Sequence, residues 1–338
     1  MPFQLNPSKV PIWQNEASLR LGLGDDSQVL SEVTNAQERL IDLLFRGIPE
    51  GQLERVGLSV GLNEIDTKQL IEQLRPSLLD QSSTGGSGKA LDVRFAEIIR
   101  IGFETSNAPE RVLAMRASTV IEVGELNRTG LLLIKALSES GFCRFETRDY
   151  GSVRRQDIGE LSYPLEQLGI SRLAAARALL ETNAPRLNIT HPSKVSKKAN
   201  RVIVMSAMHR VTPNAYRALL EPNLSIEYGI EKVSVSPLVV PGETPCLGCR
   251  DLWESEKCAD WASTAIQLAA RRDHLDDGAG LLFAVSMATK SICQFVDSGF
   301  LPVTQGFEIS LRNRIVSELG WQRHPACECL LAKQKPNR

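Results

Sequence analysis

Four cysteines near the C-terminus constrain the fold of this 338-residue chain more than any other feature. Cys246 and Cys249 form a CxxC pair, and Cys327 and Cys329 form a CxC pair. Because each pair lies on a tight turn, each can direct two sulfurs to one point, as in the closed tetrahedral shell of structural zinc. Such a site would tie the last segment of the chain to its middle and would leave no position open for substrate. Two unrelated reduced pairs, or a redox CxxC, are the alternatives.

The composition and charge exclude several classes of protein. The formal net charge is −1, so no overall field draws the chain to nucleic acid or to a membrane. The N-terminus has no basic region followed by an apolar run, and we expect no signal peptide. The most apolar stretch, 278–296, is interrupted by Lys290 and Gln294, and it predicts a buried helix rather than a membrane span. We expect a cytoplasmic protein, because the remaining cysteines are odd in number and scattered; they are Cys143, Cys258 and Cys293.

A Gly- and Ser-rich segment at 81–89 predicts a flexible linker between a module at 1–80 and a larger module at 90–338. The first module shows alternating apolar residues and then helical periodicity, with a capping pattern at Thr34. Strands followed by three short helices predict a winged helix-turn-helix. The expected strands are 18–23, with Leu19, Leu21 and Leu23 on one face, and 28–33; the expected helices are 34–46, 50–56 and 63–74.

The second module alternates short strands with helical segments. This βαβ order predicts a parallel sheet with right-handed crossovers, and hence an α/β domain. The expected strands are 119–123, 143–147 and 200–205, and the expected helices are 129–140 and 168–182.

The order of these segments resembles the ThiF/MoeB type of adenylyltransferase domain, in which the second strand is followed by an acid, here Asp149. The segment 239–252, VVPGETPCLGCRDL, is similar to that of actinobacterial ThiF-like proteins that bind leader peptides or accompany cyclodehydratases. The first module resembles the PqqD-like recognition element of ribosomal peptide pathways. Together these resemblances cover most of the chain. They imply a Rossmann-type α/β domain of a family that activates a carboxylate with ATP and often carries zinc.

The nucleotide loop of that family has the pattern GxGxxG, whose glycines let the backbone approach phosphate at a helix N-terminus. Here the loop is 124–130, and neither register restores the pattern. With Gly130 as the third glycine, Glu125 and Asn127 take the first two positions. A carboxylate about 4 Å from a phosphate, at an effective dielectric of about 20, repels it by about 4 kcal/mol. The loop therefore predicts poor ATP binding.

Other positions that the resemblance implies are also changed. Asp149 stands where the family has its ribose-binding acid, and it is the one candidate cofactor-binding residue. The family's arginine segment corresponds to 159–163, which has no arginine, and its lysine corresponds to Arg172. The acid that supports magnesium corresponds to 206–209, which reads SAMH. We therefore predict no catalytic residue, and we expect ATP not to be a cofactor.

The first module carries seven Lys or Arg and twelve Asp or Glu, which gives a charge of about −5 and argues against duplex DNA. Such a module can instead accept a peptide strand along its sheet edge. In the modules that it resembles, the leader peptide lies between the third strand and the third helix. The alternative is a domain that only supports the larger one. The candidate peptide contacts are Val29, Leu30, Val33, Ile65 and Gln69.

These observations predict a non-catalytic ThiF-like protein that binds a peptide or protein partner. By resemblance, it would recognise the leader peptide in a ribosomal thiazole and oxazole modification pathway, beside a YcaO-type cyclodehydratase, and it could form a homodimer. One alternative is an active ATP-dependent adenylyltransferase with a divergent nucleotide loop. A second alternative is a zinc-containing regulatory protein that binds nucleic acid.

Overall fold

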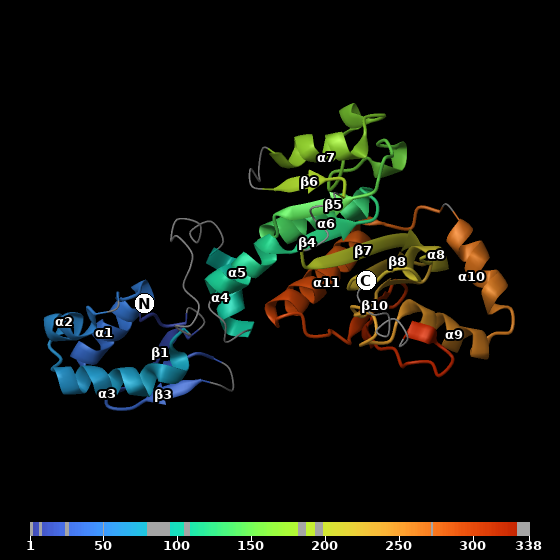
Figure 1. Cartoon of the computed structure of the whole chain (residues 1–338). Helices are drawn as coiled ribbons and strands as arrows, with labels where there is room; N and C mark the ends of the chain where they lie inside the picture. The colour runs from blue at the N-terminus through green and yellow to red at the C-terminus, as the bar shows by residue number, and fades with distance from the viewer. Residues whose placement is uncertain are drawn as a thin grey trace, which may run out of the picture. The chain divides into compact units, whose positions relative to one another are not determined.

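The computed structural model describes residues 3–6, 9–23, 27–49, 51–79, 95–104, 109–181, 187–192, 199–271 and 273–329. The chain divides into two compact units, 1–114 and 115–338 (Figure 1). The predicted linker at 81–89 lies outside the described residues.

The first unit contains a three-stranded antiparallel sheet followed by helices. The strands, in sheet order, are β1 (Pro11–Asn15), β2 (Ser18–Leu21) and β3 (Gln28–Leu30). The helices are α1 (Asn35–Arg46), α2 (Leu53–Val60), α3 (Glu64–Leu74), a short 3-10 turn at Arg75–Ser77, and α4 (Phe95–Glu104). Helix α5 (Pro109–Ser118) runs across the boundary between the units. The order of three strands and three helices matches the predicted order, with β1 added.

Local chemistry sets the ends of these elements. Thr34 caps α1 through its side chain, which accepts from the backbone N–H of Gln37, and the Gln37 side chain completes the capping box. Strand β2 is shorter than predicted, because Gly22 has a φ of +87° and turns the chain. Leu19 and Leu21 therefore lie in the core, whereas the prediction for Leu23 is wrong: its side chain is 72% exposed.

The second unit is built on an eight-stranded sheet, and this confirms the predicted parallel α/β arrangement. Its strand order is β11-β10-β9-β8-β7-β4-β5-β6. The parallel strands are β4 (Val120–Val123), β5 (Arg144–Thr147), β6 (Asn188–Thr190), β7 (Arg201–Met208) and β8 (Asn223–Tyr228). The antiparallel extension consists of β9 (Lys232–Val235), β10 (Gly306–Ser310) and β11 (Val316–Leu319).

Helices cover both faces of this sheet. Val202 and Val204 of β7 belong to the main core, while Ile203 and Met205 belong to a separate cluster, because alternate residues of a strand point to opposite faces. Helix α11 packs on α6 and on β8, β9 and β10. Helix α10 contacts α9 and β7. The helices are α6 (Arg128–Glu139), α7 (Arg172–Glu181), α8 (Pro213–Tyr216), α9 (Leu247–Lys257), α10 (Trp261–Ala270) and α11 (Gly278–Asp297), with 3-10 turns at Arg155–Asp157 and Leu165–Gln167.

Helix α11 contains the apolar stretch noted in the sequence. Within the described ranges it is the one helix long and apolar enough, by length and composition, to cross a membrane. However, 56% of its apolar window is buried inside the protein, and Leu281, Ala284 and Ile292 are part of the main core. Packing against the sheet therefore accounts for the apolar character of α11.

Candidate functional sites

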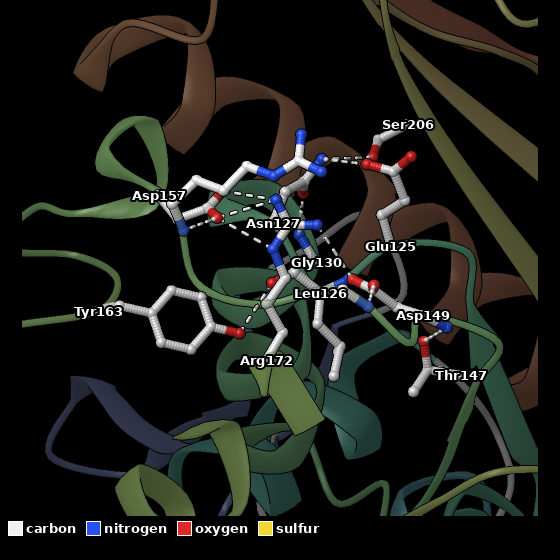
Figure 2. Close-up of polar contacts among 12 residues, drawn as sticks. Glu125, Leu126, Asn127, Gly130, Thr147, Asp149, Asp157, Tyr163, Arg172 and Ser206 are labelled. Atoms are coloured by element: carbon white, nitrogen blue, oxygen red, sulfur yellow. Dashed lines mark hydrogen bonds and ion pairs between the residues drawn. The ribbon is translucent and has the colours of Figure 1, made fainter. Parts of the chain in front are cut away.

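The loop between β4 and α6 has a tight geometry that its sequence explains. Asn127 caps α6, with its Oδ1 accepting from the backbone N–H of Gly130 at 3.0 Å. A Cβ on Gly130 would lie 2.0 Å from the carbonyl oxygen of Glu125, so this position requires glycine. Asn127 Nδ2 lies 3.4 Å from Oγ of Ser206, a residue of β7 (Figure 2). The side chain of Asn127 thus satisfies a helix N-terminal N–H that an anionic ligand could otherwise bind.

Asp149 is buried, and its carboxylate accepts three hydrogen bonds from within the protein. One of its oxygens, Oδ2, accepts from the backbone N–H of Leu126 at 2.8 Å, and Oδ1 accepts from the N–H of Gly151 at 2.7 Å. Arg172 Nη1 donates to Oδ2 at 3.2 Å, and Figure 2 shows this arginine beside the carboxylate. Tyr163 Oη donates to the carbonyl of Leu126 at 2.7 Å. The candidate ribose-binding acid therefore fixes the β4–α6 loop from inside the fold.

Arg172 connects Asp149 to a second buried acid. Its Nε and Nη2 donate to the two oxygens of Asp157, at 2.9 and 3.1 Å. Asp157 Oδ2 also accepts from the backbone N–H of Arg154 at 2.8 Å. Burial opposes the charge of Arg172, but the two carboxylates outweigh burial and raise its pKa, so the side chain stays a cation. We define Asp149, Asp157, Arg172 and Tyr163 as the loop clamp.

Sequence reasoning missed most of the loop clamp. It placed Arg172 at a lysine position of the resembling family, but the structure buries the guanidinium between two acids. It expected the helix of Arg172 to begin at 168, whereas α7 begins at Arg172 itself. The segment 159–163 has no arginine, and the residue in it that contacts the loop is Tyr163. The sequence around Asp157, RRQDIGE, carries no signal that identifies this acid as a partner of Arg172 without the fold.

The structure brings the four predicted metal ligands together. Their sulfurs all lie within 4.8 Å of one another, and three of the Sγ–Sγ separations are 3.9, 3.7 and 3.6 Å. A tetrahedron with metal–sulfur bonds of about 2.3 Å has an edge of about 3.8 Å, so the spacing fits a zinc ion. Cys246 is the N-cap of α9, and Cys249 lies in its first turn. The cluster is compatible with structural zinc held by Cys246, Cys249, Cys327 and Cys329.

The surroundings of the cysteine cluster explain how it is held. Burial raises the pKa of the Cys246 thiol to about 11, so the thiolate form needs a nearby cation. Burial also opposes ionisation of Cys249, but backbone hydrogen bonds from His324 and Cys246 outweigh it and lower the pKa. His324 Nδ1 accepts from the backbone N–H of Ala326 at 3.1 Å, which leaves its Nε2–H to donate to Glu256 at 2.9 Å. His324 therefore fixes the CxC turn through its backbone and ring.

Of the predicted peptide contacts, only some lie at the surface. Val29 is 50% exposed and Ile65 is 76% exposed, and Gln69 is also exposed. Leu30 is buried in the core of the first unit, because it alternates with Val29 along β3. Val33 is half-buried beyond the end of β3, where its N–H donates to the carbonyl of Ala17. Val29, Ile65 and Gln69 are thus accessible to a ligand.

The described part of β3 pairs only with β2, so its outer edge has backbone groups without a sheet partner there. The side chain of Gln28 joins this edge to α3, because its Nε2 donates to the carbonyl of Gln73 and its Oε1 accepts from Ser77 Oγ. The first unit therefore holds β3 and the C-terminal end of α3 together.

Comparison with known proteins shows which fold this is. No protein-family model matches the chain, and no curated protein matches it in sequence. Among solved structures, E. coli MccB with MccA matches with a TM-score of 0.66 and 14% identity, over 98% of this chain and 99% of that chain. The microcin C7 biosynthetic enzyme MccB with N-formylated MccA matches at 0.66 and 12%, over 98% and 100%. PaaA matches at 0.65 and 13%, over 93% and 98%. Similarity at this identity shows a shared fold.

Proposed function

We propose that this chain is a non-catalytic, peptide-recognising protein that has the fold of MccB without its nucleotide chemistry. The supporting observation is the loop clamp, in which Asp149 is bound to Leu126, Gly151 and Arg172. A ribose would have to compete with these groups for a carboxylate that is 8% exposed, and displacing Leu126 N–H would leave it without a partner in a buried place. Glu125, in the same loop, adds repulsion toward phosphate.

A peptide ligand agrees with the comparisons and with the first unit. MccB is solved with the peptide MccA. In this chain, β3 offers an unpaired outer edge within the described residues, and Val29 and Ile65 offer exposed apolar side chains. An added strand would gain backbone hydrogen bonds from β3, while side-chain contacts would select the sequence. We propose that the ligand is the leader of a precursor peptide, and that the part of the first unit at 1–80 is PqqD-like.

The proposal extends to the metal and to a protein partner. The cysteine cluster holds one structural zinc ion, which ties the end of the chain to α9 and supports the second unit. A YcaO-type cyclodehydratase would receive the bound precursor, since a recognition protein without its own chemistry requires an enzyme beside it. In this chain, the acidic module at 1–80 argues against a role in binding DNA.

The test is calorimetry on the full chain with leader peptides encoded by neighbouring genes, random duplex DNA, and ATP with magnesium. We expect a leader peptide to bind, and ATP to show no binding tighter than about 1 mM, a free energy near −4 kcal/mol. Ile65→Asp should weaken peptide binding at least tenfold. Leu58→Asp is the matched control, because Leu58 is a comparably exposed leucine of the same unit, on α2.

Two outcomes would overturn the proposal. Micromolar ATP binding, or pyrophosphate exchange in the presence of a peptide, would favour an active adenylyltransferase. DNA binding tighter than that of every peptide, with a steep dependence on salt, would favour a nucleic-acid regulator. Equal effects of Ile65→Asp and Leu58→Asp would place the peptide elsewhere.

A further inference from the structure

The second unit contains a cavity of about 850 Å³ that the functions above do not use. It lies between the antiparallel end of the sheet and helices α9 and α10, and its lining includes residues of β8, β9, β10 and β11. Three of the four tryptophans of the chain line it: Trp253, Trp261 and Trp321. Such a concentration of large aromatic surface around one cavity is typical of a binding site, because indole rings supply contact area at little entropic cost.

The charges of the cavity lining balance one another. Four basic residues and four acidic residues line it, so their charges sum to zero. Each basic group has a partner: Arg250 meets Glu227 at 2.7 Å, Lys232 meets Glu308 at 2.7 Å, Lys257 meets Glu254 at 3.2 Å, and Arg210 pairs with Asp251. Of the lining acids, Glu231 has no ion pair among the described residues, but it is exposed to solvent, where its attraction for a cation is screened. An anionic ligand would find no uncompensated cation here, and a ligand of either charge would lose its hydration on entry. The lining therefore favours an uncharged ligand.

The indole rings are held in place before any ligand binds. The guanidinium of Arg210 lies 4.3 Å from the centre of the Trp261 ring, and that of Arg250 lies 5.4 Å from Trp321. Trp253 Nε1 donates to the carbonyl of Gln322 at 3.1 Å. Because these contacts fix the rings in advance, a ligand would order few side chains as it binds.

The cysteine cluster anchors two walls of this cavity. Helix α9, which carries Arg250 and Trp253, begins at the CxxC pair. The adjoining part of the lining, at 319–322, precedes the CxC pair by a few residues, and His324 lies against Trp253 with ring centres 4.5 Å apart. A metal bound by the four thiolates would therefore hold the start of α9 and the segment after β11 in a fixed position relative to each other.

A sheet edge at the cavity indicates what kind of molecule it takes. Leu319, the last residue of β11, lines the cavity. Within the described ranges β11 pairs only with β10, so its outer edge can add a strand. An extended peptide gains backbone hydrogen bonds at such an edge, which a small aromatic molecule cannot use.

We propose that this cavity binds an uncharged, apolar segment of a peptide, lying along β11 and against the three tryptophans. This inference rests on the proposed function, since the segment would belong to the peptide whose leader the first unit recognises. The cavity would then select precursors by the absence of charge in that segment, while the first unit selects them by the leader.

The test uses indole fluorescence of the full chain in a Trp13→Phe background, in which every remaining tryptophan lines the cavity. The probe is an acetyl- and amide-capped heptapeptide of alternating serine and leucine. Its matched forms carry glutamate or lysine in place of leucine. We expect the neutral peptide to shift the emission and to bind at least tenfold more tightly than either charged form.

Three variants test whether the neutral peptide binds in this cavity. Trp261→Ala should weaken binding of the neutral peptide at least tenfold, and Trp261→Phe should restore part of it if the fold is intact. Leu282→Ala, at an exposed leucine of α11 outside the lining, should change nothing. No emission shift at millimolar neutral peptide, equal affinity for the charged peptides, or full binding by Trp261→Ala would overturn the inference.

The outcome is distinguishable from that of the proposed function. Ile65→Asp lies in the first unit and should leave the binding of the heptapeptide unchanged. If leader binding depends on Ile65 while Trp261→Ala has no effect on any peptide, the proposed function stands and the cavity inference fails. If Trp261→Ala weakens peptide binding while Ile65→Asp has no effect on leader binding, the cavity binds peptides and the proposed leader site at Ile65 is wrong.

Discussion

Replacing Asp149 with alanine separates a structural role from a ligand-binding role. In the structure, its carboxylate accepts hydrogen bonds from Leu126, Gly151 and Arg172, and it is almost fully buried. Truncation leaves the buried N–H of Leu126 without a partner, which lowers the free energy of unfolding by about 1 to 3 kcal/mol. It also removes one of the two acids that neutralise the charge of the buried Arg172, which adds to the loss of stability. We expect the free energy of unfolding of the second unit to fall by about 3 to 5 kcal/mol.

The assay is urea unfolding followed by tryptophan fluorescence in the Trp13→Phe background, which reports on the second unit alone. Glu125→Ala is the matched control, because this carboxylate is exposed in the same loop and its removal should cost less than about 0.5 kcal/mol. A residue that serves a nucleotide would behave in the opposite way: Asp149→Ala would leave stability nearly unchanged and would abolish ATP binding. A loss below about 1 kcal/mol would refute the structural role of Asp149.

Two further predictions concern the second unit. Purified protein should carry about one zinc ion per chain. Chelation or Cys329→Ser should lower its melting temperature sharply, because structural zinc contributes on the order of 10 kcal/mol to folding. A zinc content well below half an equivalent, in protein prepared without chelator, would contradict this prediction. Burial raises the pKa values of Tyr163, Tyr216 and Tyr228 above the ordinary 10. The contribution of these tyrosines to the free energy of unfolding is full below pH 10 and falls at higher pH, because only the unfolded state then ionises. Phenolate absorbance should show all three side chains still protonated in native protein at about pH 11. Their ionisation in native protein near pH 10 would show instead that they are accessible to water.

The sequence predicted features that depend on spacing and periodicity. The four cysteines were identified from two short motifs, and the structure places their sulfurs within 4.8 Å of one another. The parallel strands β4, β5 and β7 are predictable because each is a short segment between helical segments; β4 and β7 are rich in apolar residues, whereas β5 reads RFET. Local signals of this kind are contained in a few neighbouring residues, so they can be read without the fold.

Features that depend on contacts between distant segments were not predicted. Strand β1 alternates poorly, since most of its residues are exposed, and only its pairing with β2 makes it a strand. The predicted contact Leu30 lies in the core because the register of β3 with β2 decides which face it takes. Arg172 and Asp157 are 15 residues apart and meet only through the fold. Sequence periodicity carries no information on such pairs.

The loop clamp explains how the β4–α6 loop can keep a tight geometry without a nucleotide. Gly130 is still required, because a side chain there would collide with the carbonyl of Glu125. The N–H groups that such a loop exposes still need acceptors. Here the protein supplies them, with Asn127 accepting from Gly130 and Asp149 accepting from Leu126. An anion would have to displace both acceptors, and Asp149 is held by Arg172. Replacing Glu125 and Asn127 with glycine would therefore not by itself create a nucleotide site, because the loop clamp would remain.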